Sequence, residues 1–231
     1  MAHSHSHQSS SMMTAADPRQ HRIAFLIYLV LFHATWVGWV YLVYPWLRSL
    51  GETTLSYALT NLTLRLLIWV APVFLYLCYI DQVKAFEYLK LKQHWRRGLL
   101  IALGFSTLNF LLSVARFCWP QPHAGVVTWN SILGTSLLIG FVEEIPYRGF
   151  IFQKLTEWFS TSTATLISSL LFLLIHLPGW ISLHLLRTAT VIFVFVFGVV
   201  MIILFRWAKS LWAPIVSHSL NDFMSVVLFH T

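Results

Sequence analysis

The stretch "LLIGFVEEIPYRGFIF", residues 137–152, places two neighbouring carboxylates, Glu143 and Glu144, in a sequence that is otherwise apolar enough to lie in lipid. A charged carboxylate at the centre of a bilayer costs about 3 kcal/mol even on lenient insertion scales. Such residues therefore normally face a protein interior or a water-filled cavity. The stretch predicts a membrane helix whose acidic side chains belong to a functional site.

The composition of the whole chain supports a membrane location. The chain has 231 residues, of which 58% are hydrophobic and 10% are charged, whereas about 25% are charged in a typical soluble domain. Several apolar runs are long enough to cross a hydrocarbon core of about 30 Å, which takes about 20 helical residues. The runs are continuous rather than alternating, which argues against a β-barrel. We predict an all-α, polytopic transmembrane helical bundle in the cell membrane, with the lipid bilayer as a partner.

The apolar runs predict about seven spans, and an eighth, re-entrant piece around 116–130 is an open alternative. No soluble domain, long linker or internal repeat interrupts them, so residues 23–231 are expected to form a single transmembrane domain. Residues 1–22 are polar and low in complexity, and are expected to be a disordered cytoplasmic tail. The seven predicted spans are 23–46, 62–80, 98–115, 130–149, 163–181, 187–205 and 211–229.

The distribution of basic residues predicts the orientation of these spans. Lysine and arginine collect in cytoplasmic loops, and an N-in, C-out layout places most of them on that side. It also explains the net charge of +7 without nucleic acid as a partner. Four arginines fall on or near the other side, namely Arg48, Arg65, Arg116 and Arg187. The ten on the cytoplasmic side are Arg19, Arg22, Lys84, Lys90, Lys92, Arg96, Arg97, Lys154, Arg206 and Lys209.

The fourth predicted span carries an acid pair with unequal surroundings. Glu144 and Arg148 are four residues apart and share a helical face, so each lowers the cost of burying the other. Glu143 points about 100° away and has no such partner, which makes it the better candidate for taking a proton from water. Pro146 removes a backbone N–H and loosens the helix one turn back, near Glu143. The alternative is a structural ion pair with a carboxylate that reaches the membrane surface.

Two further spans carry ionisable groups. His176 ends an apolar stretch, where a lone histidine is usually a core residue. His218 and Asp222 are four residues apart on one helical face and Asn221 flanks it, so this histidine can help to hold an oxygen that gains negative charge. His218 and Asp222 can also simply pair with each other. Because three separate spans contribute such groups, we predict that they converge on one cavity.

The three motifs together resemble a known family. Glu143-Glu144-x-x-x-Arg148, Phe172-x-x-x-His176 and His218-x-x-x-Asp222 occur in this order. They resemble the motifs of the CAAX protease and bacteriocin-processing (CPBP, or Abi) membrane proteins, which are type II CAAX prenyl endopeptidase-like. The resemblance covers about residues 130–225, the expected catalytic core. It implies an intramembrane endopeptidase whose substrate is a membrane-associated peptide or protein, including lipidated ones, and whose active site opens to the cytoplasm.

The resemblance also implies roles for these residues. Glu143 would activate the water with help from His176, and Glu144 with Arg148 would organise the site. His218 and the residue four positions later would stabilise the oxyanion.

That last position departs from the family pattern. It is commonly asparagine in the family and is Asp222 here, and an ionised carboxylate cannot donate a hydrogen bond. Asp222 would then be protonated or would orient His218. Asn221 is the alternative donor.

Several alternatives remain open at this point. No cofactor is expected, but Glu143, His176 and His218 resemble the ligand set of some zinc peptidases. Buried acids and histidines also build proton relays in transporters, and a non-catalytic immunity or scaffold protein is a third class. One geometric conflict stands against the shared cavity. Counted from the predicted cytoplasmic span ends, Glu143 and His218 lie about 10 Å deep and His176 about 20 Å.

Overall fold

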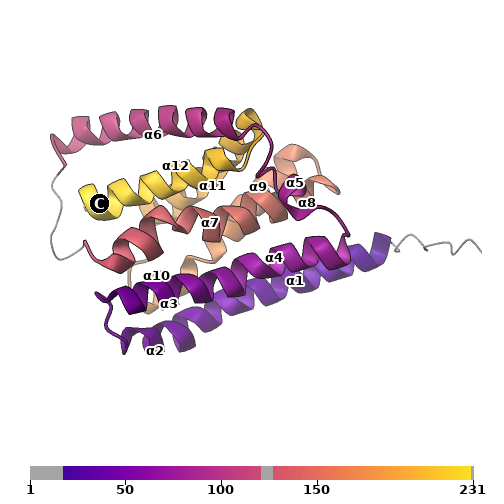
Figure 1. Ribbon diagram of the computed structural model, residues 1–231, viewed down its shortest axis with the longest axis horizontal. Helices are drawn as coiled ribbons and strands as arrows, with labels where there is room; N and C mark the ends of the chain where they lie inside the picture. Colours follow the sequence, from indigo (N-terminus) through magenta and orange to yellow (C-terminus); the bar gives the residue numbers. More distant parts are fainter. Residues whose placement is uncertain (1–17, 121–126, 230–231) are drawn as a thin grey trace, which may run out of the picture.

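The computed structural model describes residues 18–120 and 127–229, which form helices and connecting loops without any strand (Figure 1). Within this part of the chain, five helical rods are long and apolar enough to cross a membrane. The protein is therefore an all-helical, multi-pass membrane protein, as predicted. These five are Arg19–Arg48, Leu55–Ile80, Trp95–Phe117, Thr161–Ser182 and Thr188–Ala208. Together with the helical stretches 130–156 and 212–228 of the described residues, they are numbered below in chain order as the first, second, third, fifth and sixth of seven rods.

The first two rods are continuous helices with wider, π-helical turns inside them. Pro45 and Pro72 each follow such a turn, because a proline has no N–H to donate and its ring pushes the preceding carbonyl away. The first rod consists of α1 (Pro18–Gly38), η1 (Trp39–Val43) and α2 (Tyr44–Arg48). The second consists of α3 (Leu55–Arg65), η2 (Leu66–Val70), α4 (Ala71–Leu75) and η3 (Tyr76–Ile80).

The fourth rod carries the acid pair and is the most irregular one. After the short α5 (Ala85–Tyr88) and the straight third rod α6 (Trp95–Phe117), it comprises η4 (Asn130–Leu137), α7 (Ile139–Glu144), η5 (Ile145–Ile151) and α8 (Phe152–Thr156). Pro146 lies at the start of η5. Both glutamates thus end the last regular turn before a π-helical segment, the kind of irregularity that is frequent at functional sites.

The remaining rods form the second half of the bundle. Ser160 caps the fifth rod through a hydrogen bond from Thr163 N to its Oγ (3.2 Å), a common helix start. The elements are α9 (Thr161–Leu174), α10 (Leu177–Ser182), α11 (Thr188–Ala208), α12 (Trp212–Phe223) and η6 (Met224–Leu228).

The helices correspond to the seven predicted segments, with differences at their ends. The fourth and seventh segments are helical at the predicted places but are not among the five rods that meet the length and hydropathy criteria. The prediction of a tail reaching residue 22 is wrong at its end, because α1 already begins at Pro18, and proline is well suited to the first helical turn. The re-entrant piece predicted at 116–130 falls partly on residues 121–126, and most of the predicted tail falls on residues 1–17. Both ranges lie outside the described residues.

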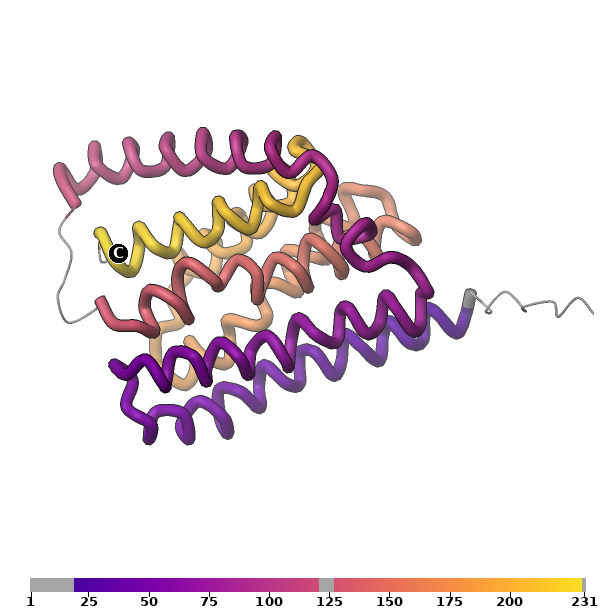
Figure 2. Tube along the Cα trace, in the orientation of Figure 1, coloured from indigo at the N-terminus to yellow at the C-terminus, as the bar shows by residue number. Residues whose placement is uncertain are grey.

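Helix α12 lies among several neighbours in the bundle. It packs against α6, α7, α11 and η4 (Figure 2). Glycines allow two of these approaches. A Cβ on Gly140 of α7 would meet the Ile215 carbonyl and come within 2.6 Å of Ser219 Oγ. A Cβ on Gly98 of α6 would come within 3.1 Å of Trp212 Cβ. Small residues at helix contacts are typical of membrane bundles.

The ten basic residues that were predicted to be cytoplasmic belong to segments at one end of the bundle. The start of α1, the α5 segment, the end of α8 and the turn between α11 and α12 all lie there (Figure 1). Lys154 bonds Asp81 at this end, with Nζ 2.8 Å from Oδ2. The prediction for Arg65 needs correction, because this arginine lies within the second rod rather than at the opposite end of the bundle.

Candidate active site

Glu144, Arg148 and His218 form a hydrogen-bonded core inside the bundle. Arg148 donates through Nη1 to Glu144 Oε1 (3.0 Å), and His218 Nδ1 lies 2.7 Å from the same oxygen. Glu144 is completely buried, and Arg148 and His218 are 1% and 4% exposed. The predicted pairing within the fourth rod is therefore present, and it extends to α12 through the histidine.

Arg148 connects this core to two more helices. Its Nη2 donates to the Gly198 carbonyl on α11 (3.1 Å). Its guanidinium carbon lies 4.2 Å from the centre of the Phe172 ring on α9, within the range of a cation–π interaction. One side chain thus ties α9 and α11 to the helix of the two glutamates.

Glu143 is the less engaged of the two acids. It is 6% exposed, and its buried Oε2 has no hydrogen-bond partner. That oxygen lies 3.9 Å from His218 Nε2, which is beyond hydrogen-bonding distance. The close approach of α7 and α12 at Gly140, one helical turn before Glu143, brings these two groups together. Glu143 is therefore a buried carboxylate beside an imidazole, with one oxygen left for another partner.

His176 lies where the fifth rod breaks between α9 and α10. Its Nδ1 is 2.9 Å from the Phe172 carbonyl, and since a carbonyl only accepts, Nδ1 carries the proton. In the neutral ring this leaves Nε2 as an acceptor. The Phe172 ring centre lies 4.9 Å from that of His176 and 6.1 Å from that of His218. The two histidines therefore flank the same phenylalanine.

The conflict over depth disappears in the structure. Glu143 lies thirteen residues before the end of α8 at Thr156, about 20 Å along a helix axis. His176 lies fifteen residues after the start of α9 at Thr161, about 22 Å along its axis. The fourth rod continues beyond its predicted end at 149, and this places Glu143 deeper than predicted.

The start of α12 explains the depth of His218. Leu211, just before the helix, is completely buried, and its N–H donates to the Lys90 carbonyl (3.2 Å). Helix α12 therefore begins beneath the loop that follows α5 rather than at the surface of the bundle.

Asp222 lies at the edge of the core. Its Oδ2 is 3.6 Å from His218 Nε2, and its side chain is 28% exposed. Asn221 donates to Asp222 Oδ1 (3.2 Å) and accepts from Asn109 on α6 (3.0 Å). The oxygen and the nitrogen of the Asn221 amide thus each have one partner, and the bond to Oδ1 holds Asp222 beside His218.

The structure brings all six predicted residues into one region. Three carboxylates surround His218 directly, those of Glu143, Glu144 and Asp222. Arg148 joins them through Glu144, and His176 through the Phe172 ring. Among the described residues, no group of three or more His, Cys, Asp and Glu side chains is arranged to hold a metal ion. Zinc binding by Glu143, His176 and His218 stays an alternative prediction.

Arg65 is a neighbour of this region that the sequence reasoning missed. Its Nη1 donates to the Gly134 carbonyl on η4 (3.2 Å), and its guanidinium lies 5.6 and 5.8 Å from the rings of Trp39 and Trp69. It also interacts electrostatically with Glu143. A cation inside the apolar run 62–80 was the available signal, since intramembrane charges mark functional sites for either sign.

The fold and this region together define a class: a multi-pass helical membrane protein with buried acids and imidazoles gathered from three helices. Residues 125–224 match the family model described as type II CAAX prenyl endopeptidase Rce1-like. The matched segment contains all three motifs, and the resemblance predicted from them is confirmed. This match supports a membrane endopeptidase of the CAAX protease type in general. No curated protein and no solved structure matches the chain.

Proposed function

We propose that the protein is an intramembrane endopeptidase that uses Glu143 and His176 to activate a water molecule. The observation that carries the proposal is the state of Glu143, which is buried, unpartnered at Oε2 and 3.9 Å from His218 Nε2. A carboxylate in this state can accept a proton from water. The free Nε2 of His176 is a second acceptor for the same water.

The proposed reaction begins with attack of the water oxygen on the carbonyl carbon of the scissile peptide bond. Glu143 takes a proton from the water as the C–O bond forms, and the carbonyl oxygen gains the negative charge. When the C–N bond breaks, Glu143 returns the proton to the departing amine. One carboxylate thus acts first as general base and then as general acid.

His218 is proposed to stabilise the oxyanion. With Nδ1 bound to Glu144, only the doubly protonated ring can donate through Nε2 as well. The carboxylates of Glu143, Glu144 and Asp222 stabilise the positive charge of that form. Losing one such donor typically raises the barrier by about 3–4 kcal/mol. Asp222 would keep the ring in place, a role that does not require it to donate.

The proposed substrate is a peptide or protein held at the membrane, including prenylated or otherwise lipidated ones. The site is expected to open toward the end of the bundle with the basic residues, which we propose is cytoplasmic. The test is purified protein in detergent with a panel of membrane peptides, comparing wild type with Glu143→Ala and His176→Ala. We expect cleavage by wild type and a rate reduced by about 10² or more in each variant. Equal rates in all three proteins would end the proposal.

Metal dependence is a separate question with its own experiment. Because the zinc alternative lacks a grouped ligand set in the described residues, we expect a strong chelator to leave the cleavage rate unchanged. Activity that is lost with the chelator and restored by zinc would favour the metal-assisted alternative.

A further inference from the structure

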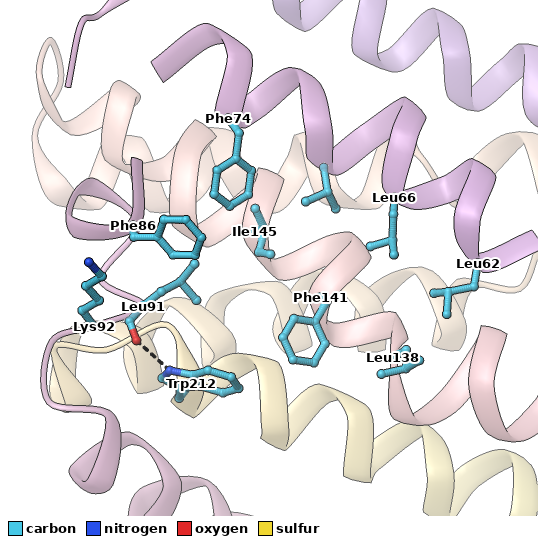
Figure 3. Close-up of a pocket in the computed structure, with 11 residues that line it drawn as sticks. Leu62, Leu66, Phe74, Phe86, Leu91, Lys92, Leu138, Phe141, Ile145 and Trp212 are labelled. Carbon is cyan, nitrogen blue, oxygen red and sulfur yellow. Dashed lines mark hydrogen bonds between the residues drawn. The ribbon is translucent and has the colours of Figure 1, made fainter. Parts of the chain in front are cut away.

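A large apolar groove lies beside the helix of the two glutamates. It has a volume of about 510 Å³ and runs between the second rod and the fourth, with Trp212 of α12 on its far side (Figure 3). Its walls include Leu66 and Phe74 on the second rod and Phe141 and Ile145 on the fourth. Nothing in the proposed reaction uses this groove.

The groove is separate from the candidate active site. Phe141 and Ile145 precede and follow Glu143 by two residues, so on a helix they point about 160–200° away from it. The groove therefore lies against the back of the helix whose opposite face carries Glu143. An occupant would press on that helix without entering the site.

The length of the groove fits one leaflet of a bilayer. Along the second rod it extends from Phe74 to Leu62, a twelve-residue stretch of about 18 Å. Half of the roughly 30 Å hydrocarbon core is about 15 Å. A chain that enters at the Phe74 end would therefore reach close to the middle of the membrane.

The mouth of the groove is basic. Lys92 lines it there, with Nζ 5.9 Å from the Phe86 ring. A second cavity of about 560 Å³ continues past Leu91, Lys92 and Trp212 to Trp95. Trp212 Nε1 donates to the Leu91 carbonyl (2.8 Å), which fixes this part of the wall (Figure 3). Basic side chains and tryptophans at the end of an apolar groove are features that recognise an anionic lipid headgroup.

We propose that this groove binds one acyl chain of an anionic phospholipid, whose phosphate pairs with Lys92. The chain lies along Leu66 and Phe74 and contacts Phe141 and Ile145 on the back of the fourth rod. Three observations support it: the apolar walls, the match to the depth of one leaflet, and the cation at the mouth rather than inside. The binding does not depend on the proposed peptidase activity.

The test uses native mass spectrometry of protein released from nanodiscs that contain equal amounts of phosphatidylglycerol and phosphatidylcholine. Wild type should retain one phosphatidylglycerol. Leu66→Trp should lose it because the indole fills the groove. Leu67→Trp is the matched control, since Leu67 is 60% exposed on the outer face of the same rod. Equal retention by the two tryptophan variants overturns the proposal.

The headgroup contact is tested separately. Lys92→Gln should lower the preference for phosphatidylglycerol about fivefold, whereas Lys84→Gln, at a lysine with an 83% exposed side chain, should behave as wild type. An unchanged preference in Lys92→Gln overturns the proposal even if Leu66→Trp fails to fold. Displacement of one phospholipid by one prenylated peptide also overturns the proposal, because the groove would then bind the substrate.

Discussion

At the scale of single residues, the Oε1 atom of Glu144 connects two helices. It accepts hydrogen bonds from Arg148 on its own rod and from His218 on α12, while Oε2 is buried without a partner. Removing this carboxylate leaves the guanidinium and the imidazole without their common acceptor. Breaking a buried ion pair in this way typically costs 3–5 kcal/mol, because the remaining charge stays uncompensated.

We therefore expect Glu144→Ala to lower the free energy of unfolding by about 3–5 kcal/mol. The measurement is equilibrium unfolding in detergent. Glu87→Ala is the matched control, since Glu87 pairs with Lys84 at the surface (3.7 Å) and such pairs contribute about 1 kcal/mol or less. A loss at Glu144 no larger than that at Glu87 would contradict this description of the core.

The sequence predicted contacts within one helix better than contacts between helices. The i, i+4 spacing was sufficient to pair Glu144 with Arg148, because helix geometry alone brings these positions together. It could not show that His218 would bond Glu144, since that contact depends on how α7 meets α12. The contact of Arg65 could not be predicted for the same reason, because its acceptor, the Gly134 carbonyl, lies on another rod.

At the scale of helices, the contact between α7 and α12 determines the geometry around Glu143. Gly140 faces the Ile215 carbonyl and Ser219 Oγ so closely that a Cβ there cannot fit without a shift of one helix. The carbonyl belongs to the backbone, so no side-chain rotation can relieve the overlap. The separation of Glu143 from His218 thus depends on a missing side chain one turn away.

We expect Gly140→Val to reduce peptide cleavage by at least tenfold, because it moves α12 away from α7, and to destabilise the fold by about 1–3 kcal/mol. Cleavage rates and unfolding curves are measured together. Gly104→Val on α6 is the control, since nothing lies within 4 Å of a Cβ at that position. Wild-type cleavage by the Gly140 variant would show that this contact does not set the site.

The predicted helices were correct in order, and the errors lie at their ends. Apolar runs reveal where a rod crosses lipid, but the fourth rod continues through Gln153 and Lys154, which are polar. Lys154 is only 5% exposed because it pairs with Asp81 after the second rod. A partner that distant in sequence is invisible to a hydropathy pattern, and the shortened span produced the false difference in depth.

At the scale of the whole molecule, the basic residues predict which end of the bundle faces the cytoplasm. The loops at that end are joined to each other, since Tyr88 donates to Glu157 (3.1 Å) and His21 Nδ1 lies 3.3 Å from Asp81. Cys118, exposed just after α6, lies at the opposite end. The two ends can therefore be distinguished by labelling.

We expect a membrane-impermeant thiol reagent to label Cys118 in intact cells when Cys78 is replaced by serine. In a second protein, with Cys118 also replaced, Lys84→Cys should react only after the membrane is permeabilised. The expectation follows from the excess of basic residues at the Lys84 end of the bundle, since such residues collect on the cytoplasmic side of membrane proteins. The reverse labelling pattern would invert the orientation and place the opening of the site on the other side.

The central claim is that Glu143 and His176 act on one shared water molecule, and a double-mutant cycle on cleavage tests it most directly. Single-turnover rates are measured for wild type, Glu143→Gln, His176→Ala and the double variant. If both side chains serve one step, the double variant cleaves about as slowly as the worse single variant, since residues that act as a unit are strongly non-additive. Losses that multiply in the double variant, or single variants as fast as wild type, would contradict the account.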